Sequence, residues 1–420
     1  MNNIKKIAKS FSTKIIAFLG FYLCDVILAR GLSVDDYAEW SYFFSIINIV
    51  LWISNFGISL TIRTIVAKEN EIVRRKHYVN CGIILRFLVS ILFSLLFLVL
   101  SKEIAKVSGW PNQYPDLQWL MIAGCLLPLF MAFTELWKNI FIGSARLNSL
   151  LAMAVFEHLG YAIGCLVGIL IFHDIKGAIA GYYFGYLLAT ISGSILEKVS
   201  FRGFVLSEET RKDIKNIFKS AIPYVVTCII AFVILEMDTV MIGMFKVGNA
   251  ELANYNIAKK MVRNAISVNE AFLYAMLPQF ASINKGRYSE AYKRFKEILS
   301  CNLLITAAVG VGLALVLPAI VPIIYGKDYI AAGKYILALL PAYLCNGITQ
   351  CFMQFLYYRE KAKYVSASYS CSFIVNLVMN WTLIPRMGAM GAAIGTVASL
   401  VPFMMLLAIC TIREWKRLKE

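Results

Sequence analysis

Residues Glu197–Lys219 read EKVSFRGFVLSEETRKDIKNIFK and form the longest polar interruption in a chain of 420 residues that is 60% hydrophobic. This stretch holds six basic and four acidic side chains, a composition that does not dissolve in a hydrocarbon layer. It lies almost at the midpoint of the chain and separates two apolar halves. We therefore interpret it as an aqueous loop between two membrane-embedded halves.

The composition of the whole chain supports this interpretation. Only 16% of the residues are charged, whereas soluble domains have roughly a quarter. The net charge of +16 does not indicate a nucleic-acid partner, because the basic residues are scattered through short segments and do not form one basic stretch. The cysteines occur singly and without a CxxC pair, so we expect no metal site and no cofactor.

Apolar runs of about 20 residues, the length that crosses a bilayer as a helix, can be placed twelve times. The sequence therefore predicts an all-α polytopic membrane protein with twelve transmembrane helices. The predicted spans are Phe11–Leu32, Trp40–Ile62, Val79–Leu100, Leu117–Trp137, Leu150–Phe172, Gly177–Leu196, Ala221–Met244, Leu252–Phe280, Ile298–Tyr325, Ala331–Tyr357, Tyr364–Ile384 and Gly388–Ile412.

The distribution of lysine and arginine predicts the orientation of these spans. One side of the predicted membrane carries 29 of these residues, namely the side of both termini and of Glu197–Lys219, and the other side carries eight. Because positive charge is retained in the cytoplasm, both termini are predicted to be cytoplasmic. We expect an N-terminal lobe over residues 1–200, a cytoplasmic linker loop over 201–219 and a C-terminal lobe over 220–420.

The two halves also repeat. Leu126-Leu127-Pro128 and Arg146 recur as Leu339-Leu340-Pro341 and Arg359 at an offset of 213, and Gly181 and Gly185 recur as Gly391 and Gly395 at an offset of 210. Six spans per repeat insert both lobes the same way up, so a pseudo-two-fold axis along the membrane normal is expected to relate them. The glycines should let a neighbouring helix approach closely, and Pro128 and Pro341 should kink their helices.

Charged residues inside predicted spans are the candidates for function, because they are costly in lipid. In the eighth span, Asn256, Lys259, Arg263 and Glu270 fall within roughly 80° of one another on a helix, and Lys260 is adjacent. A cationic strip of this kind suits a diphosphate or an acidic sugar. The alternative is a structural ion network in which the cations pair with Asp25 or Glu270.

Further candidates lie in the first half. Asp25 is about 16 Å into the membrane, and it could pair with the eighth span, bind a coupling proton or cation, or both. Arg30 marks the outer interface unless it faces a central cleft. Arg86, Glu157 and His158 lie about a third of the way in from the cytoplasmic side, where they could meet an arriving head group. For His158 a satisfied hydrogen bond between helices is the alternative, and Asp238 is interpreted as a solvated residue near the outer end.

The C-terminal part of the sequence contains a pattern that resembles a known family. The pattern Asn376-x3-Asn380-x4-Pro385-x2-Gly388-x2-Gly391-Ala392-Ala393-x2-Thr396 resembles the N…N…P…G…GAA…T signature of the multidrug/oligosaccharidyl-lipid/polysaccharide exporter superfamily. Two stretches agree with it, Leu28–Tyr37 and the segment from Asp238 through Glu251 and Tyr255 to Ala258. The resemblance is closest to the polysaccharide flippases, typified by the O-antigen flippase, and the twelve spans differ from the fourteen typical of lipid II flippases.

The resemblance implies a transporter and not an enzyme. Such a protein moves undecaprenyl diphosphate carrying an oligosaccharide repeat unit from the cytoplasmic to the periplasmic leaflet of the bacterial inner membrane, by alternating access, for O-antigen or capsule assembly. Its expected partners are the lipid-linked oligosaccharide, membrane lipids, a polysaccharide polymerase, a chain-length regulator and a coupling H⁺ or Na⁺. The resemblance also favours Arg30 as a residue of the cleft.

Two rival functions are tested against the same residues. A cation-coupled multidrug antiporter would be compatible with Asp25, but the basic strip of the eighth span disfavours it because drug antiporters mostly expel cations. A membrane-embedded polysaccharide polymerase or ligase would be expected to hold a sizeable periplasmic loop with catalytic basic residues. The longest predicted outer loop, Ser101–Asp116, has 16 residues and only two lysines.

Overall fold

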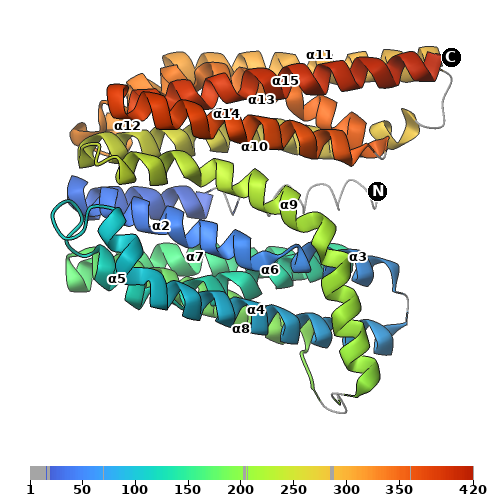
Figure 1. The fold of residues 1–420 in the computed structure, drawn as a ribbon, viewed down its shortest axis with the longest axis horizontal. Helices are drawn as coiled ribbons and strands as arrows, with labels where there is room; N and C mark the ends of the chain where they lie inside the picture. The colour runs from blue at the N-terminus through green and yellow to red at the C-terminus, as the bar shows by residue number, and fades with distance from the viewer. Residues whose placement is uncertain are drawn as a thin grey trace. The chain divides into compact units, whose positions relative to one another are not determined.

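The structure is a computed structural model that describes residues 16, 19–69, 71–201, 205, 207–283, 288–359 and 361–419. All regular secondary structure in these residues is helical, which confirms the predicted all-α class (Figure 1). Residues 19–31 form a helix. The elements that follow it are α2 (Val34–Asn55), α3 (Ile58–Lys68), α4 (Ile72–Val107), α5 (Leu117–Ala123), α6 (Leu127–Gly143), α7 (Leu147–Phe172), α8 (Ile175–Glu197), α9 (Glu208–Met244), α10 (Asn249–Ile283), α11 (Tyr288–Leu315), α12 (Leu317–Ile324), the 3-10 helix η1 (Lys327–Tyr329), α13 (Ala332–Tyr358), α14 (Ala362–Met387) and α15 (Ala389–Lys419).

Most of the predicted spans appear among these helices. Within the described residues, seven helices are long and apolar enough to cross a membrane: α4, α7, α8, α11, α13, α14 and α15. Two bent pairs, α2 with α3 and α5 with α6, pass the same test together. The other three predicted spans fall on the helix over residues 19–31, on α9 and on α10. The chain is thus a polytopic membrane protein, and the number of twelve spans stays a prediction.

Two of the spans are broken at identifiable residues. Phe56 and Gly57, between α2 and α3, both adopt left-handed backbone conformations, and the two helices meet at 48°. The α5–α6 pair bends by 50°, and Pro128 lies in the first turn of α6. Proline fits this position because its missing N–H would be unbonded there in any case. The predicted kink near Pro128 is confirmed, whereas α13 continues through Pro341 as one helix and its kink stays a prediction.

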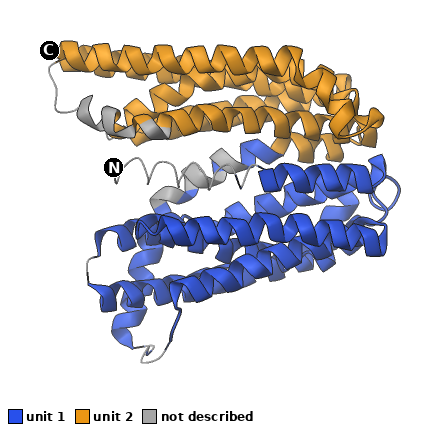
Figure 2. Ribbon diagram, turned by 180° about the vertical axis from the view of Figure 1, so that it is seen from behind, with its two compact units in different colours: residues 1–236 blue, residues 237–420 orange. Residues whose placement is uncertain are grey.

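The chain divides into two compact units, residues 1–236 (unit 1) and 237–420 (unit 2), coloured blue and orange in Figure 2. Helix α9 runs without interruption across this boundary. Its beginning belongs to the core of unit 1, because Ile217 and Ala221 are buried there and Phe218 stacks on Phe56 with ring centroids 5.8 Å apart. The second half of the polar stretch is therefore helical from Glu208, and the prediction of a loop over residues 201–219 is wrong for this part.

Helices α7 and α8 approach each other backbone to backbone. A Cβ atom added at Gly181 would lie 2.3 Å from the Cys165 nitrogen, and one added at Gly168 would lie 2.3 Å from the Gly177 oxygen. In unit 2, a Cβ at Gly391 would lie 2.5 Å from the Leu383 carbonyl oxygen. These distances confirm that the predicted glycine faces are helix contact surfaces.

The repeated residues occupy matching places in the two units. Pro128 lies in α6 and Pro341 in α13. Arg146 follows α6 and is the residue directly before α7, and Arg359 directly follows α13 and precedes α14. The order of elements around the repeated sequence blocks is thus the same in unit 1 and in unit 2.

Candidate substrate and ion sites

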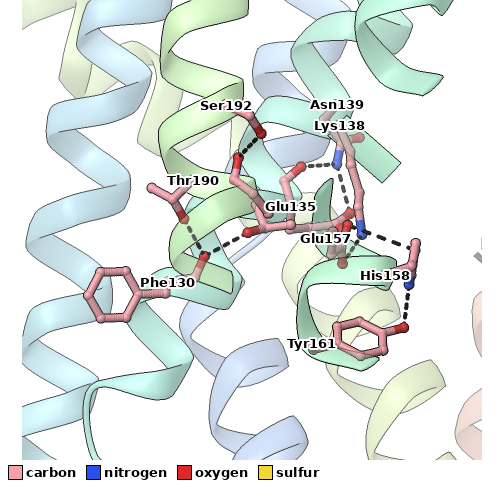
Figure 3. Close-up of polar contacts among 11 residues, drawn as sticks. Phe130, Glu135, Lys138, Asn139, Glu157, His158, Tyr161, Thr190 and Ser192 are labelled. Atoms are coloured by element: carbon pink, nitrogen blue, oxygen red, sulfur yellow. Dashed lines mark hydrogen bonds and ion pairs between the residues drawn. The ribbon is translucent and has the colours of Figure 1, made fainter. Parts of the chain in front are cut away.

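A buried ion pair joins α6 to α7 in unit 1 (Figure 3). Lys138 Nζ lies 2.8 Å from Glu157 Oε1, and the side chains are 28% and 3% exposed. Next to it, Asn139 Nδ2 donates a hydrogen bond of 2.8 Å to Glu135 Oε1. The sequence predicted Glu157 as a candidate but not its partner, because a contact between two different helices leaves no pattern in one helix.

His158 adjoins this ion pair. Its Nδ1 hydrogen-bonds with the hydroxyl of Tyr161, one turn later in the same helix, and its Nε2 lies 3.9 Å from Glu157 Oε2. That glutamate oxygen has no hydrogen-bond partner among the described residues. A Cβ at Gly20 would lie 2.5 Å from His158 Cβ, so the helix over residues 19–31 packs directly on α7 here. His158 is thus a packed residue with its hydrogen bond inside α7.

Arg86 is enclosed in unit 1, with 0% exposure. Its Nη1 donates to the carbonyl oxygen of Ser54, and its Nε donates to that of Ala132 at 3.5 Å. Ser54 is in the last turn of α2, where carbonyl groups lack donors from their own helix. This geometry assigns Arg86 to the bend between α2 and α3, and its side chain does not reach a surface at which a head group could arrive.

Asp25 is buried in unit 1, and its depth in the membrane stays a prediction. Its side chain is 4% exposed, and Oδ1 accepts a hydrogen bond of 2.9 Å from the hydroxyl of Tyr37 on α2. Arg30, five residues later, is exposed. The helix over residues 19–31 thus carries one enclosed carboxylate and one cation at the surface of its unit.

A second enclosed carboxylate, Asp238 on α9, lies at the centre of a polar cluster in unit 2. Its Oδ2 accepts from Tyr255 Oη at 2.7 Å and from Thr396 Oγ1 at 2.6 Å. Its Oδ1 accepts from Asn380 Nδ2 at 2.7 Å and from Asn376 Nδ2 at 3.3 Å. The polar residues of the family signature therefore surround one carboxylate.

The interpretation of Asp238 as a solvated residue at the outer end is wrong. Asp238 is 4% exposed, and its carboxylate accepts hydrogen bonds from side chains of α10, α14 and α15 instead of from water. A signal in the sequence could have found it, because the repeat offset of 213 that relates Pro128 to Pro341 also relates Asp25 to Asp238. Each unit thus holds one buried aspartate that accepts a hydrogen bond from a tyrosine hydroxyl.

The predicted candidates of the eighth span all lie on α10. Asn256 is buried, and its Oδ1 accepts from Thr239 Oγ1 at 3.1 Å. The same threonine oxygen accepts from Lys259 Nζ at 2.5 Å, so Thr239 links the amide and the ammonium group. Lys259, Lys260 and Glu270 are half-buried, whereas Arg263 is exposed. Along α10, the side chains thus change from a buried, hydrogen-bonded amide at Asn256 to an exposed guanidinium at Arg263.

The two units offer different chemistry. In unit 1 the half-buried Lys138 is held by a carboxylate and the buried Arg86 by carbonyl oxygens. In unit 2 the cations of α10 include one that reaches the surface of the unit. The described residues contain no group of three or more His, Cys, Asp or Glu side chains that could hold a metal ion. A polar or anionic ligand could therefore reach a cation at Arg263 on α10 and at Arg30 in unit 1.

The sequence matches one known protein family. Residues 4–284 match the model of the family described as polysaccharide biosynthesis protein. No curated protein matches the sequence. The sequence match covers the first half of the chain and α10, the helix that carries the basic residues.

Solved structures resemble the whole chain. The lipid II flippase MurJ in an inward closed conformation matches with a TM-score of 0.77 at 12% identity, covering 99% of this chain and 90% of that one. An inward-facing multidrug resistance MATE family transporter of the MOP superfamily matches with 0.77 at 12%, over 96% and 95%. The eukaryotic MATE transporter AtDTX14 matches with 0.68 at 14%, over 99% and 97%. At these identities the similarity establishes the fold, which is that of flippases and transporters.

Proposed function

The chain belongs to the polysaccharide biosynthesis protein family, and from this premise we propose that it moves a lipid-linked oligosaccharide across the bacterial inner membrane. The cargo is an undecaprenyl diphosphate that carries a sugar repeat unit, and it passes from the cytoplasmic to the periplasmic leaflet. A polysaccharide polymerase and a chain-length regulator would act on the product. The similarity to a flippase supports this proposal.

The observation that carries the proposal is the position of Arg263. It lies 14 residues after the start of α10, hence about 21 Å along a helix of 35 residues, and its side chain is exposed. A cation at this level is costly in lipid, by about 2.5–3.5 kcal/mol or more, but it is stable in a polar cleft. A guanidinium there can bind two phosphate oxygens at once, which suits the diphosphate of the cargo.

Transport against a gradient needs an energy source, and we assign ion coupling to Asp25. It is a buried carboxylate with a hydroxyl partner, Tyr37, on the neighbouring helix, so its charge can be neutralised by H⁺ or by Na⁺. The variant Asp25→Asn should keep a similar shape and lose the dependence of export on the ion gradient. Full export with an unchanged gradient dependence would remove Asp25 from this role.

The test of the cargo site compares membrane-inserted protein with surface polymer in the same cells. Arg263→Ala should reduce export to the background of a strain without the protein, at normal protein abundance. Arg263→Lys should restore part of it, because lysine supplies the charge without the fork geometry. Lys416→Ala, which removes an exposed cation at the end of α15, is the matched control and should leave export unchanged.

Two outcomes would contradict the assignment. Normal export by an abundant Arg263→Ala protein would show that the arginine does not bind the cargo. A loss of folded protein in Arg263→Ala that is repaired by Glu270→Gln in the same chain would show instead that the two residues form a structural ion pair on α10.

A cation-coupled multidrug antiporter is the second candidate. It is favoured by the equal TM-score of the MATE transporter and by the two buried aspartates, Asp25 and Asp238. An antiporter should protect cells from cationic dyes, and Arg263→Ala should leave that protection intact or improve it. Dye efflux from membrane vesicles, measured with and without an ion gradient, separates this function from oligosaccharide export.

A further inference from the structure

Glu39 is a buried acid outside all of the sites above. It lies in the second turn of α2 and is 2% exposed. The segment that follows α4, residues 108–116, packs nearby: Tyr42 on α2 donates a hydrogen bond of 2.6 Å to Ser108 Oγ and stacks on Tyr114 at 5.2 Å. Tyr114 is itself 0% exposed. Glu39 is therefore shielded from water by folded protein.

The surroundings of Glu39 are acidic. The strongest charges acting on its carboxyl group are those of Asp116, just before α5, and Asp36 on its own helix. The Oε1 atom of Glu39 has no hydrogen-bond partner among the described residues. The nearby phenols of Tyr42, one turn later on α2, and of Tyr114 carry no positive charge, and burial raises the pKa of Tyr114 so that it stays neutral.

Glu39 differs in this respect from Glu157, the other almost fully buried glutamate described above. Glu157 has the ammonium group of Lys138 at 2.8 Å, whereas Glu39 forms no ion pair with a lysine, arginine or histidine in the described part of the chain. A buried carboxylate without a cation is unfavourable by several kcal/mol, and such a group takes up a proton instead.

We propose that Glu39 is a proton-binding site, held as the neutral carboxylic acid beneath the segment of residues 108–116. The proton can leave for water only when this segment lifts away, so proton release and opening of the segment are one event. The proposal goes beyond the cargo function, since it uses none of the residues assigned to cargo or to coupling. It identifies H⁺ as a ligand of unit 1 whatever the cargo is.

The protonated carboxyl group can be observed directly. Infrared spectra of the purified full-length protein in detergent at about pH 6, where an ordinary glutamate is ionised, should contain a carboxylic-acid carbonyl band that shifts in D₂O. Glu39→Gln should remove intensity from this band. The matched control is Glu103→Gln on α4, whose side chain is 67% exposed, and it should leave the band unchanged. Equal band intensity in the wild type and in Glu39→Gln would overturn the proposal.

The linked opening has its own measurement. Glutamine stays neutral at all pH values, so opening of residues 108–116 should become easier with rising pH in the wild type only. The ratio of wild-type to Glu39→Gln amide hydrogen exchange in this segment, measured at equal pH, should rise by up to about tenfold per pH unit. A ratio that does not change with pH would contradict the proposal.

A second variant covers the case in which Glu39→Gln does not fold. Asp116→Asn removes the strongest neighbouring negative charge, so Glu39 should release its proton at lower pH. The carboxylic-acid band of this variant should then disappear at a lower pH than that of the wild type. Disappearance at the same or at a higher pH would exclude Glu39 as the protonated group.

Discussion

The hydrogen bonds of Arg86 indicate that it stabilises the fold and does not bind cargo. Because its guanidinium donates to carbonyl oxygens of two segments, Arg86→Lys should lose at least one charged hydrogen bond and destabilise the protein by about 1.5–3 kcal/mol. Thermal unfolding of the purified protein measures the loss, with Arg413→Lys, an exposed site on α15, as the control. A variant of normal stability that fails to export would return Arg86 to the cargo path.

Substitution of Asp238 should also destabilise the protein, but for a different reason than substitution of Arg86. Asp238→Asn replaces an acceptor of four side-chain hydrogen bonds with a group that has only one acceptor oxygen. At least two donors lose their acceptor, so we expect a destabilisation of about 3 kcal/mol or more. Chemical denaturation in micelles would test this. Asp35→Asn, at the exposed start of α2, is the comparison and should change stability by less than about 1 kcal/mol.

At this scale the sequence predicts which residues are unusual but not which contacts they form. The apolar run around Asp25 predicts that it lies inside a span, whereas its burial against α2 is known only from the structure. The partners of Arg86 and Glu157 could not be predicted. They are a backbone carbonyl group and a lysine on other helices, and which groups come into contact depends on how the helices pack. Asp238 was misplaced because its neighbours come from helices far apart in the sequence.

Helices α7 and α8 provide the prediction at the scale of elements. A methyl group at Gly181 would lie within 2.6 Å of three atoms of Cys165, two of which belong to the backbone. Gly181→Ala should therefore push the helices apart and destabilise the protein by about 1–3 kcal/mol. The control is Gly312→Ala on α11, where a Cβ would meet nothing within 4 Å. This variant should be neutral or more stable by about 0.5–1 kcal/mol.

Thermal unfolding of the two glycine variants side by side checks this argument, and equal stabilities would refute it. The contact itself was predictable, because three glycines spaced by four residues define one helix face. Gly160, Gly164 and Gly168 on α7 have the same spacing, but only the structure shows that the two faces meet.

The ends of the helices were less predictable than their centres. Helix α4 runs from Ile72 to Val107, beyond the predicted limits of Val79 and Leu100 at both ends. Hydropathy reports the part of a helix that fits the hydrocarbon layer, whereas backbone hydrogen bonding continues into water. The start of α9 was missed for a related reason: Ile214, Ile217 and Phe218 have the spacing of one helix face, but the charges around them dominated the composition.

Two patterns extend over the whole molecule: sequence blocks that repeat in the two units, and an unequal distribution of basic residues between the predicted sides of the membrane. The repeated blocks occupy matching helices in both units, and Asp25 and Asp238 share their offset. The basic residues, in contrast, do not follow the repeat but the predicted sides of the membrane, 29 against eight. Charge therefore predicts orientation, and the apolar pattern predicts the helices.

The orientation is open to a direct test at sites that lie between helices. Reporters inserted after Val205, between α8 and α9, and after Arg359, between α13 and α14, should both respond as cytoplasmic. A reporter after Gln113, between α4 and α5, should respond as periplasmic, because that side carries few basic residues. The first two sites are separated by an even number of predicted spans, so they must agree with each other whatever the absolute orientation. Disagreement between them would reject the count of spans in the second half, whereas agreement on the periplasmic side would reject only the inference from charge.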